Sequence, residues 1–124
     1  MIHEDKIEHP ELLEKSVKYL SDHGYTDIKA DLEGYEAPNS FYKKDSDVTI
    51  IPDIVGYMDG VKHYFELGIK SSRPKLLKSK WLFLDTLSKM RKHRFKIITM
   101  KGHYRFTDEL IKELDLKKKP IRIE

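Results

Sequence analysis

The stretch VTIIPDIVGYMDGVKHYFELGI, residues 48–69, decides the fold of this 124-residue chain. Two β-rich runs flank Asp59-Gly60, and an Asp-Gly pair in that position is a strong signal for a hairpin with a two-residue turn. In such a hairpin Met58 faces Val61, and Asp53 then lies directly opposite Glu66 on the same face of the sheet. Pro52 has no backbone N–H, which predicts an edge position or a bulge in the first strand.

The alternation of side chains along the hairpin fixes its register. One face is apolar and carries Ile54, Met58, Val61, Phe65, Leu67 and Ile69. The other face carries both acids, and a slip of one residue would bury the charges against the apolar layer. Like charges directly opposite each other are destabilising, so this pair needs a cation, a shared proton or a different register. A divalent metal is the natural partner of two converging carboxylates.

The sequence on either side of the hairpin supplies the rest of the fold. Before it, a helix is predicted over 10–23, an alternating strand over 26–33 and a loop over 36–47. After it, a helix over 73–93 follows a serine cap at 71–72, then come a strand over 95–100 and a short helix over 108–114 capped by Thr107. This order predicts an α/β (α+β) fold with a mixed four-stranded sheet flanked by helices. We expect one domain over 1–124, with a core over 9–114 and a tail over 115–124 that is mobile or an edge strand.

Composition excludes several classes of protein. The chain has no cysteine, so a disulfide framework and a cysteine–zinc site are excluded. It has no apolar run of 18 residues, and its first ten residues are polar and acidic, which predicts neither a membrane span nor a signal peptide. We therefore expect an intracellular, cytoplasmic protein.

The overall net charge of +3 hides a strong asymmetry. Residues 1–70 carry 8 Lys or Arg and 15 Asp or Glu, whereas residues 71–106 carry 11 Lys or Arg and one acid. The second block predicts a surface that binds a polyanion, or else only a solvated charged face. The expected nucleic-acid-binding residues lie on or just after the predicted helix over 73–93: Lys75, Lys78, Lys80, Lys89, Arg91, Lys92 and Arg94.

Pro52-Asp53, the hairpin, and Glu66 followed by a lysine and a basic helix resemble the PD-(D/E)xK nuclease superfamily. The resemblance covers residues 9–100 in topology and 47–72 in motif, and small Holliday junction resolvase-like members are nearest in size. It implies a restriction-endonuclease-like core and a metal-dependent endonuclease that hydrolyses phosphodiester bonds of DNA, including branched DNA. Members of this group often form dimers, which implies a homodimer.

The resemblance also implies roles for single residues. Asp53 and Glu66 would hold Mg²⁺ or Mn²⁺, Lys70 would be the catalytic lysine, and Glu14 would match an acidic residue on the first helix of some members. The family pattern places its lysine two residues after the acid, where this chain has Gly68. Two alternatives therefore stay open: a catalytically impaired nuclease fold that binds nucleic acid as an accessory module, and an unrelated α+β interaction protein.

Overall fold

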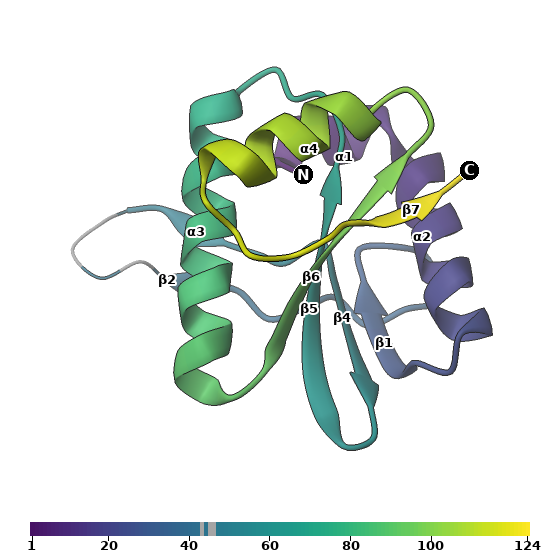
Figure 1. The fold of residues 1–124 in the computed structure, drawn as a ribbon. Helices are drawn as coiled ribbons and strands as arrows, with labels where there is room; N and C mark the ends of the chain where they lie inside the picture. Colours follow the sequence, from purple (N-terminus) through teal and green to yellow (C-terminus); the bar gives the residue numbers. More distant parts are fainter. Residues whose placement is uncertain (43, 45–46) are drawn as a thin grey trace.

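The computed structural model describes residues 1–42, 44 and 47–124. Five strands of this part form one mixed sheet in the order β1-β4-β5-β6-β7 (Figure 1). Their bounds are β1 Thr26–Ala30, β4 Ile54–Met58, β5 Val61–Gly68, β6 Arg94–Met100 and β7 Ile121–Ile123. Strands β1, β4 and β5 are antiparallel neighbours, whereas β6 runs parallel to β5 and β7 parallel to β6. A separate pair, β2 (Phe41–Tyr42) and β3 (Thr49–Ile50), forms a small antiparallel sheet.

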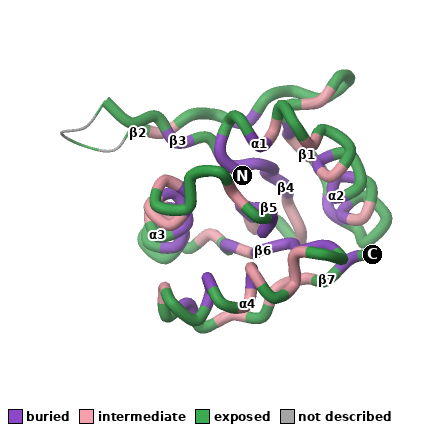
Figure 2. Tube along the Cα trace, turned by 90° about the horizontal axis from the view of Figure 1, so that it is seen from above, coloured by how far each residue is buried: buried purple, intermediate pink, exposed green. Residues whose placement is uncertain are grey.

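Helices cover both faces of the large sheet. Their bounds are α1 His3–Glu8, α2 Pro10–Asp22, α3 Pro74–Arg91 and α4 Tyr104–Glu113, and Figure 1 shows α2 and α3 on opposite sides of the strands. The apolar stripe of α2 packs with Ile54, Phe65 and Leu67 in one core. Helices α3 and α4 pack with Val55 and Tyr64 in a second core on the other face. Buried residues accordingly follow the strands and the inner sides of the helices (Figure 2).

The hairpin has the predicted register. Met58 pairs with Val61 and Ile54 with Phe65. Asp59 and Gly60 both have positive φ, 52° and 76°, as a type I′ turn requires. The predicted apolar face is confirmed, since Ile54, Phe65 and Leu67 lie in the core under α2. The face expected to carry the acids also packs a second core, which includes Val55 and Tyr64.

The mixed α/β sheet is confirmed, but the numbers of elements differ. The segment 115–124, predicted to be mobile or an edge strand, ends in the edge strand β7, which makes the sheet five-stranded. Helix α1 was not predicted, because six residues are too few to show a helical period. Pro52 lies between β3 and β4, and β4 is an internal strand between β1 and β5 rather than an edge. The predicted loop over 36–47 contains β2, and its residues Lys43, Asp45 and Ser46 lie outside the described part.

Two predicted helix caps are wrong. Helix α3 follows Arg73, and its N-cap makes no side-chain hydrogen bond. The Ser71 hydroxyl instead accepts a hydrogen bond from the Arg73 N–H at 3.1 Å. Helix α4 starts one turn earlier than predicted, at Tyr104, so Thr107 lies inside it and turns its hydroxyl towards the sheet.

None of the helices in the described part of the chain combines the length and the hydropathy that crossing a membrane requires.

Candidate functional site

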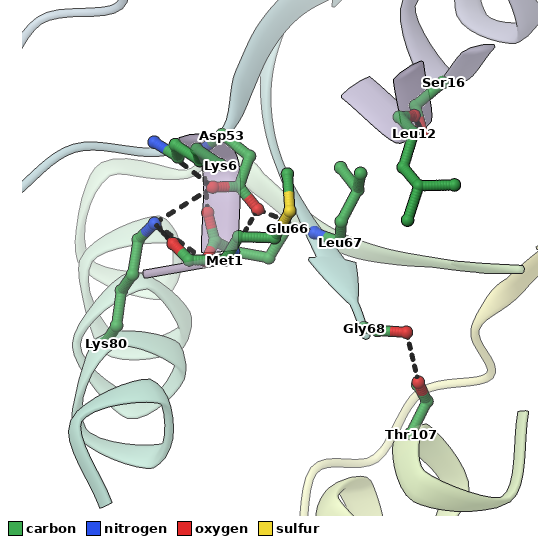
Figure 3. Close-up of polar contacts among 10 residues, drawn as sticks. All are labelled: Met1, Lys6, Leu12, Ser16, Asp53, Glu66, Leu67, Gly68, Lys80 and Thr107. Atoms are coloured by element: carbon green, nitrogen blue, oxygen red, sulfur yellow. Dashed lines mark hydrogen bonds and ion pairs between the residues drawn. The ribbon is translucent and has the colours of Figure 1, made fainter. Parts of the chain in front are cut away.

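Two carboxylates lie side by side where β4 begins and β5 approaches its end. Asp53 precedes β4, Glu66 lies in β5, and both side chains are fully buried. The Asp53 N–H donates to Glu66 Oε2 at 2.7 Å, and the Leu67 N–H donates to Asp53 Oδ2 at 2.8 Å. Each side chain is therefore held by the backbone of the neighbouring strand, which fixes the direction in which both carboxylates point (Figure 3).

A lysine from α3 completes the site. Lys80 Nζ lies 3.1 Å from Asp53 Oδ1 and 3.1 Å from Glu66 Oε1, and its side chain is 9% exposed. Lys80 follows Leu77 by three residues and precedes Leu84 by four, which places it on the buried stripe of the helix. The sequence placed Lys80 among the surface cations; the structure corrects this, because the helix face that packs on the sheet includes it.

The segment before α2 contributes two more cations. The Met1 amino group donates to Asp53 Oδ2 and lies 3.3 Å from Glu66 Oε1. Lys6 of α1 has its Nζ 3.3 Å from Asp53 Oδ1. Lys80 also donates to the Met1 carbonyl at 2.6 Å, so that α1, α3 and the two strands meet at one cluster.

These contacts shift the ionisation of the site. Burial opposes the charged form of Asp53, but Lys80, the Met1 ammonium and Lys6 outweigh it and hold the pKa of that carboxyl well below its usual value. Burial would lower the pKa of Lys80, yet Asp53 and Glu66 raise it above its usual value, so Lys80 stays an ammonium. For the Met1 amino group burial prevails, and its pKa is lowered despite both carboxylates.

Asp53 and Glu66 are the residues of this site that could hold a divalent cation. The Lys80 ammonium and the Met1 amino group each bridge both side chains, so oxygens of Asp53 and Glu66 converge on shared cation positions. Magnesium is typically held by one or two carboxylates together with water and substrate phosphate oxygens. Among the described residues, no cluster of three or more His, Cys, Asp or Glu side chains could hold a metal ion. Water and substrate oxygens would therefore complete the coordination.

Packing explains why position 68 is a glycine in this chain. The hydroxyls of Thr107 and Thr99 donate to the Gly68 carbonyl at 2.8 and 3.0 Å. A Cβ at Gly68 would lie 2.3 Å from Thr107 Oγ1 and 2.7 Å from its Cγ2. Helix α4 thus closes against β5 at this point, and no longer side chain fits there.

Two other predicted site residues lie elsewhere. Lys70 is exposed beyond the end of β5, and its backbone N–H donates to His103 Nδ1. Glu14 is exposed on α2 and lines a surface groove with Glu11 and Glu33. Within the described part of the chain, neither side chain makes a hydrogen bond or ion pair with Asp53 or Glu66.

The remaining predicted nucleic-acid-binding residues are at least partly exposed. Lys78 pairs with Glu113 at 2.7 Å and Lys89 with Asp85 at 3.0 Å, which neutralises part of their charge. Arg91 lies over the ring of Phe41, 5.5 Å from its centroid. Four of these residues are exposed and make no ion pair in the described ranges: Lys75, Arg91, Lys92 and Arg94.

Comparison with known proteins gives no match: no protein-family model, no curated protein and no solved structure matches this chain. Its functional interpretation therefore rests on the geometry of the site.

The Gly68→Ala variant tests the close approach of α4. We expect the free energy of unfolding to fall by about 1–3 kcal/mol, because the new methyl group overpacks against Thr107. Gly56→Ala is the matched control in β4, since a Cβ there would meet its neighbours at 3.6 Å or more. Urea denaturation of both variants measures the difference, and equal stabilities would contradict the packing argument.

The Asp53→Asn variant tests the charge cluster in the metal-free protein. Removing one partner of a buried ion pair destabilises by about 3–5 kcal/mol at neutral pH. Because the pKa of folded Asp53 lies below its usual value of 3.8, its charge stabilises fully above that pH, and this contribution is lost as pH falls further. The difference in free energy of unfolding between wild type and Asp53→Asn should therefore become smaller as the pH falls from 4 to 2.

Urea denaturation at several pH values measures that gap. Asp108→Asn is the control, because it breaks the largely exposed ion pair with Arg122 and should cost less than about 1 kcal/mol. A gap for Asp53→Asn that stays constant with pH would show that its carboxylate does not stabilise the fold through charge.

Proposed function

We propose that this chain is a divalent-metal-dependent nuclease of the PD-(D/E)xK type that hydrolyses phosphodiester bonds of DNA. The observation that carries the proposal is the convergence of Asp53, Glu66 and Lys80, with the lysine nitrogen 3.1 Å from an oxygen of each acid. These are the residue types that the superfamily combines, with the lysine supplied by α3 instead of by the strand. The order α2, β1, β4, β5, α3, β6 supports a restriction-endonuclease-like core.

Each residue has a distinct role in this proposal. Asp53 and Glu66 would hold Mg²⁺ or Mn²⁺, which activates a water nucleophile and neutralises charge on the phosphate. Lys80 keeps its proton, because both carboxylates raise its pKa, so it would not serve as a general base. It would stabilise the negative charge that develops on the phosphate oxygens during attack.

The basic residues of α3 support DNA as the substrate. Lys75 lies five residues before Lys80 and Lys89 nine residues after it, which corresponds to about 7 and 14 Å along a helix axis. Phosphates follow each other at about 3.4 Å of helix axis along one DNA strand. At about 100° per residue, however, Lys75 and Lys89 lie about 140° and 180° around the helix from the buried Lys80. They would therefore contact phosphates that pass over the outer side of α3, beside the one at the carboxylates.

A second candidate function is nucleic-acid binding without hydrolysis. It is favoured by the contacts of the carboxylates, because each of their four oxygens already faces a nitrogen of the protein. The cluster is therefore internally satisfied, and the basic α3 would serve binding alone.

Cleavage assays with site variants test the proposed function. We expect the wild type to cleave plasmid or branched DNA with Mg²⁺ or Mn²⁺, and Asp53→Ala and Glu66→Ala to lose this activity. Lys80→Met should slow cleavage about 100-fold or more, as loss of one charge-stabilising group typically does. Lys70→Met is the matched control and should stay within about threefold of wild type, because Lys70 is exposed and makes no contact with either acid in the described structure.

The other outcomes are equally informative. Loss of activity in Lys70→Met with full activity in Lys80→Met would contradict the assignment of the lysine. A salt-sensitive gel shift without metal-dependent cleavage of linear, supercoiled or branched DNA would support the second candidate. The absence of both cleavage and binding would leave an α/β interaction protein. Circular dichroism of every variant checks that the fold is retained.

A further inference from the structure

The segment 1–8 covers the carboxylates of the candidate site. Its Met1 and Ile2 side chains are 0% and 3% exposed, and they belong to the cores on opposite faces of the sheet. Lys6 reaches back to Asp53, and the Met1 amino group contacts both acids (Figure 3). The segment is thus anchored by two apolar side chains and presents two amines to the site.

Those amines occupy the places that a divalent cation would need. Asp53 Oδ1 faces Lys6 and Lys80, while Asp53 Oδ2 and Glu66 Oε1 face the Met1 amino group. A magnesium ion binds carboxylate oxygens at about 2.0–2.1 Å. The nitrogens of Lys80 and Lys6 lie farther from Asp53 Oδ1, at 3.1 and 3.3 Å. The amines of segment 1–8 and the metal ion would bind the same carboxylate oxygens, so the segment and the metal compete directly.

Helix α1 is otherwise weakly attached. Glu4 forms an ion pair at 3.5 Å with Arg73, the residue before α3, and both side chains are more than half exposed. Asp5 contacts Ser72 at 3.4 Å through Oδ1, while its buried Oδ2 has no hydrogen-bond partner in the described structure. A helix of six residues is not stable by itself in water. Docking of α1 therefore depends on the apolar anchors and on the charge cluster.

A cavity lies on one side of the docked segment. It has a volume of about 360 Å³ and is lined, among others, by Ile2, Lys6, Leu76 and Lys80. The segment is thus incompletely packed against α3 on that side.

We propose that segment 1–8 and a divalent cation are alternative occupants of the Asp53–Glu66 site, so that metal binding releases α1 and opens the site to its substrate. This inference rests on the proposed function, because it takes the two acids as metal ligands. The metal binds only the open form, so its apparent affinity equals the intrinsic affinity multiplied by the open fraction. A change that loosens the segment without altering its charge must therefore tighten metal binding.

Ile2→Ala is that change. Truncating a buried isoleucine weakens docking of the segment, and we expect Mg²⁺ or Mn²⁺ to bind at least about tenfold more tightly than to wild type, measured by calorimetry without DNA. Leu116→Ala is the matched control, because Leu116 is buried in the same core as Ile2 but belongs to the chain after α4. It should leave metal affinity unchanged although it destabilises the fold.

A lock provides the converse test. The chain has no cysteine, so Asp5→Cys combined with Ser72→Cys introduces one pair whose native side chains approach within 3.4 Å. The oxidised protein should bind Mn²⁺ at least about tenfold more weakly than the same protein after reduction. The Mn²⁺ affinity of each single-cysteine variant should be the same with and without the reductant.

Hydrogen exchange gives a third readout. Amides of residues 2–9 should exchange faster when the wild type is saturated with Mg²⁺, whereas the exchange rates of the α2 amides should not change.

The outcomes separate this inference from the proposed function. Metal binding and DNA cleavage with unchanged or slower exchange of residues 2–9, and with wild-type affinity in Ile2→Ala, would overturn the competition and leave the nuclease intact. Absence of metal binding in calorimetry together with absence of cleavage would overturn both. Tighter binding in Leu116→Ala to the same degree as in Ile2→Ala would reduce the effect to general loosening of the fold and also refute the inference.

Discussion

Asp53 and Glu66 are both fully buried on neighbouring strands, and two adjacent carboxylates inside a protein are costly unless positive charge and hydrogen bonds surround them. The structure meets this condition with backbone N–H groups of the strands and with amines from α1 and α3. Lys80 can reach the acids only if α3 lies across the ends of β4 and β5. The charge cluster therefore requires α3 to lie there, and the apolar packing of Leu77, Trp81 and Leu84 on the sheet holds the helix in the same place.

The polar contacts of Gly68 set a second constraint on the same strand. Thr99 and Thr107 both donate to its carbonyl, and Thr107 fills the space that a side chain at position 68 would take. This arrangement fastens α4 to β5 and closes the place from which a strand lysine could reach the acids. The amines that contact the acids come from other elements: Lys80 from the buried stripe of α3, Lys6 from α1, and the Met1 amino group.

Much of the fold could be predicted because its signals are local. Asp59-Gly60 specifies a tight turn, and alternation along the two strands specifies the register, so the opposition of Asp53 and Glu66 followed from pairs such as Met58 with Val61. Lys80 was recognisable in principle, because it lies three residues after Leu77 and four before Leu84 on the buried stripe. The burial of Lys80 was not predicted, because the neighbouring lysines of the helix indicated a solvated face. Helix α1 offered no such signal, because a six-residue helix shows no period and its contacts with Asp53 join residues nearly fifty positions apart.

The charge balance of the cluster bears on the proposed exchange of segment 1–8 for a metal ion. With all amines protonated, two carboxylates face three ammonium groups, from Met1, Lys6 and Lys80, and the cluster carries one net positive charge. Exchange of the Met1 amino group and Lys6 for one divalent cation leaves that charge unchanged, because two single charges leave and one double charge enters. With the Met1 amino group protonated, the buried site would therefore keep its net charge on opening. Because burial lowers the pKa of that group, its neutral form would instead leave the metal-bound site with one more positive charge than the closed site. Under the proposed function, the remaining positive charge would face the single negative charge of a phosphodiester.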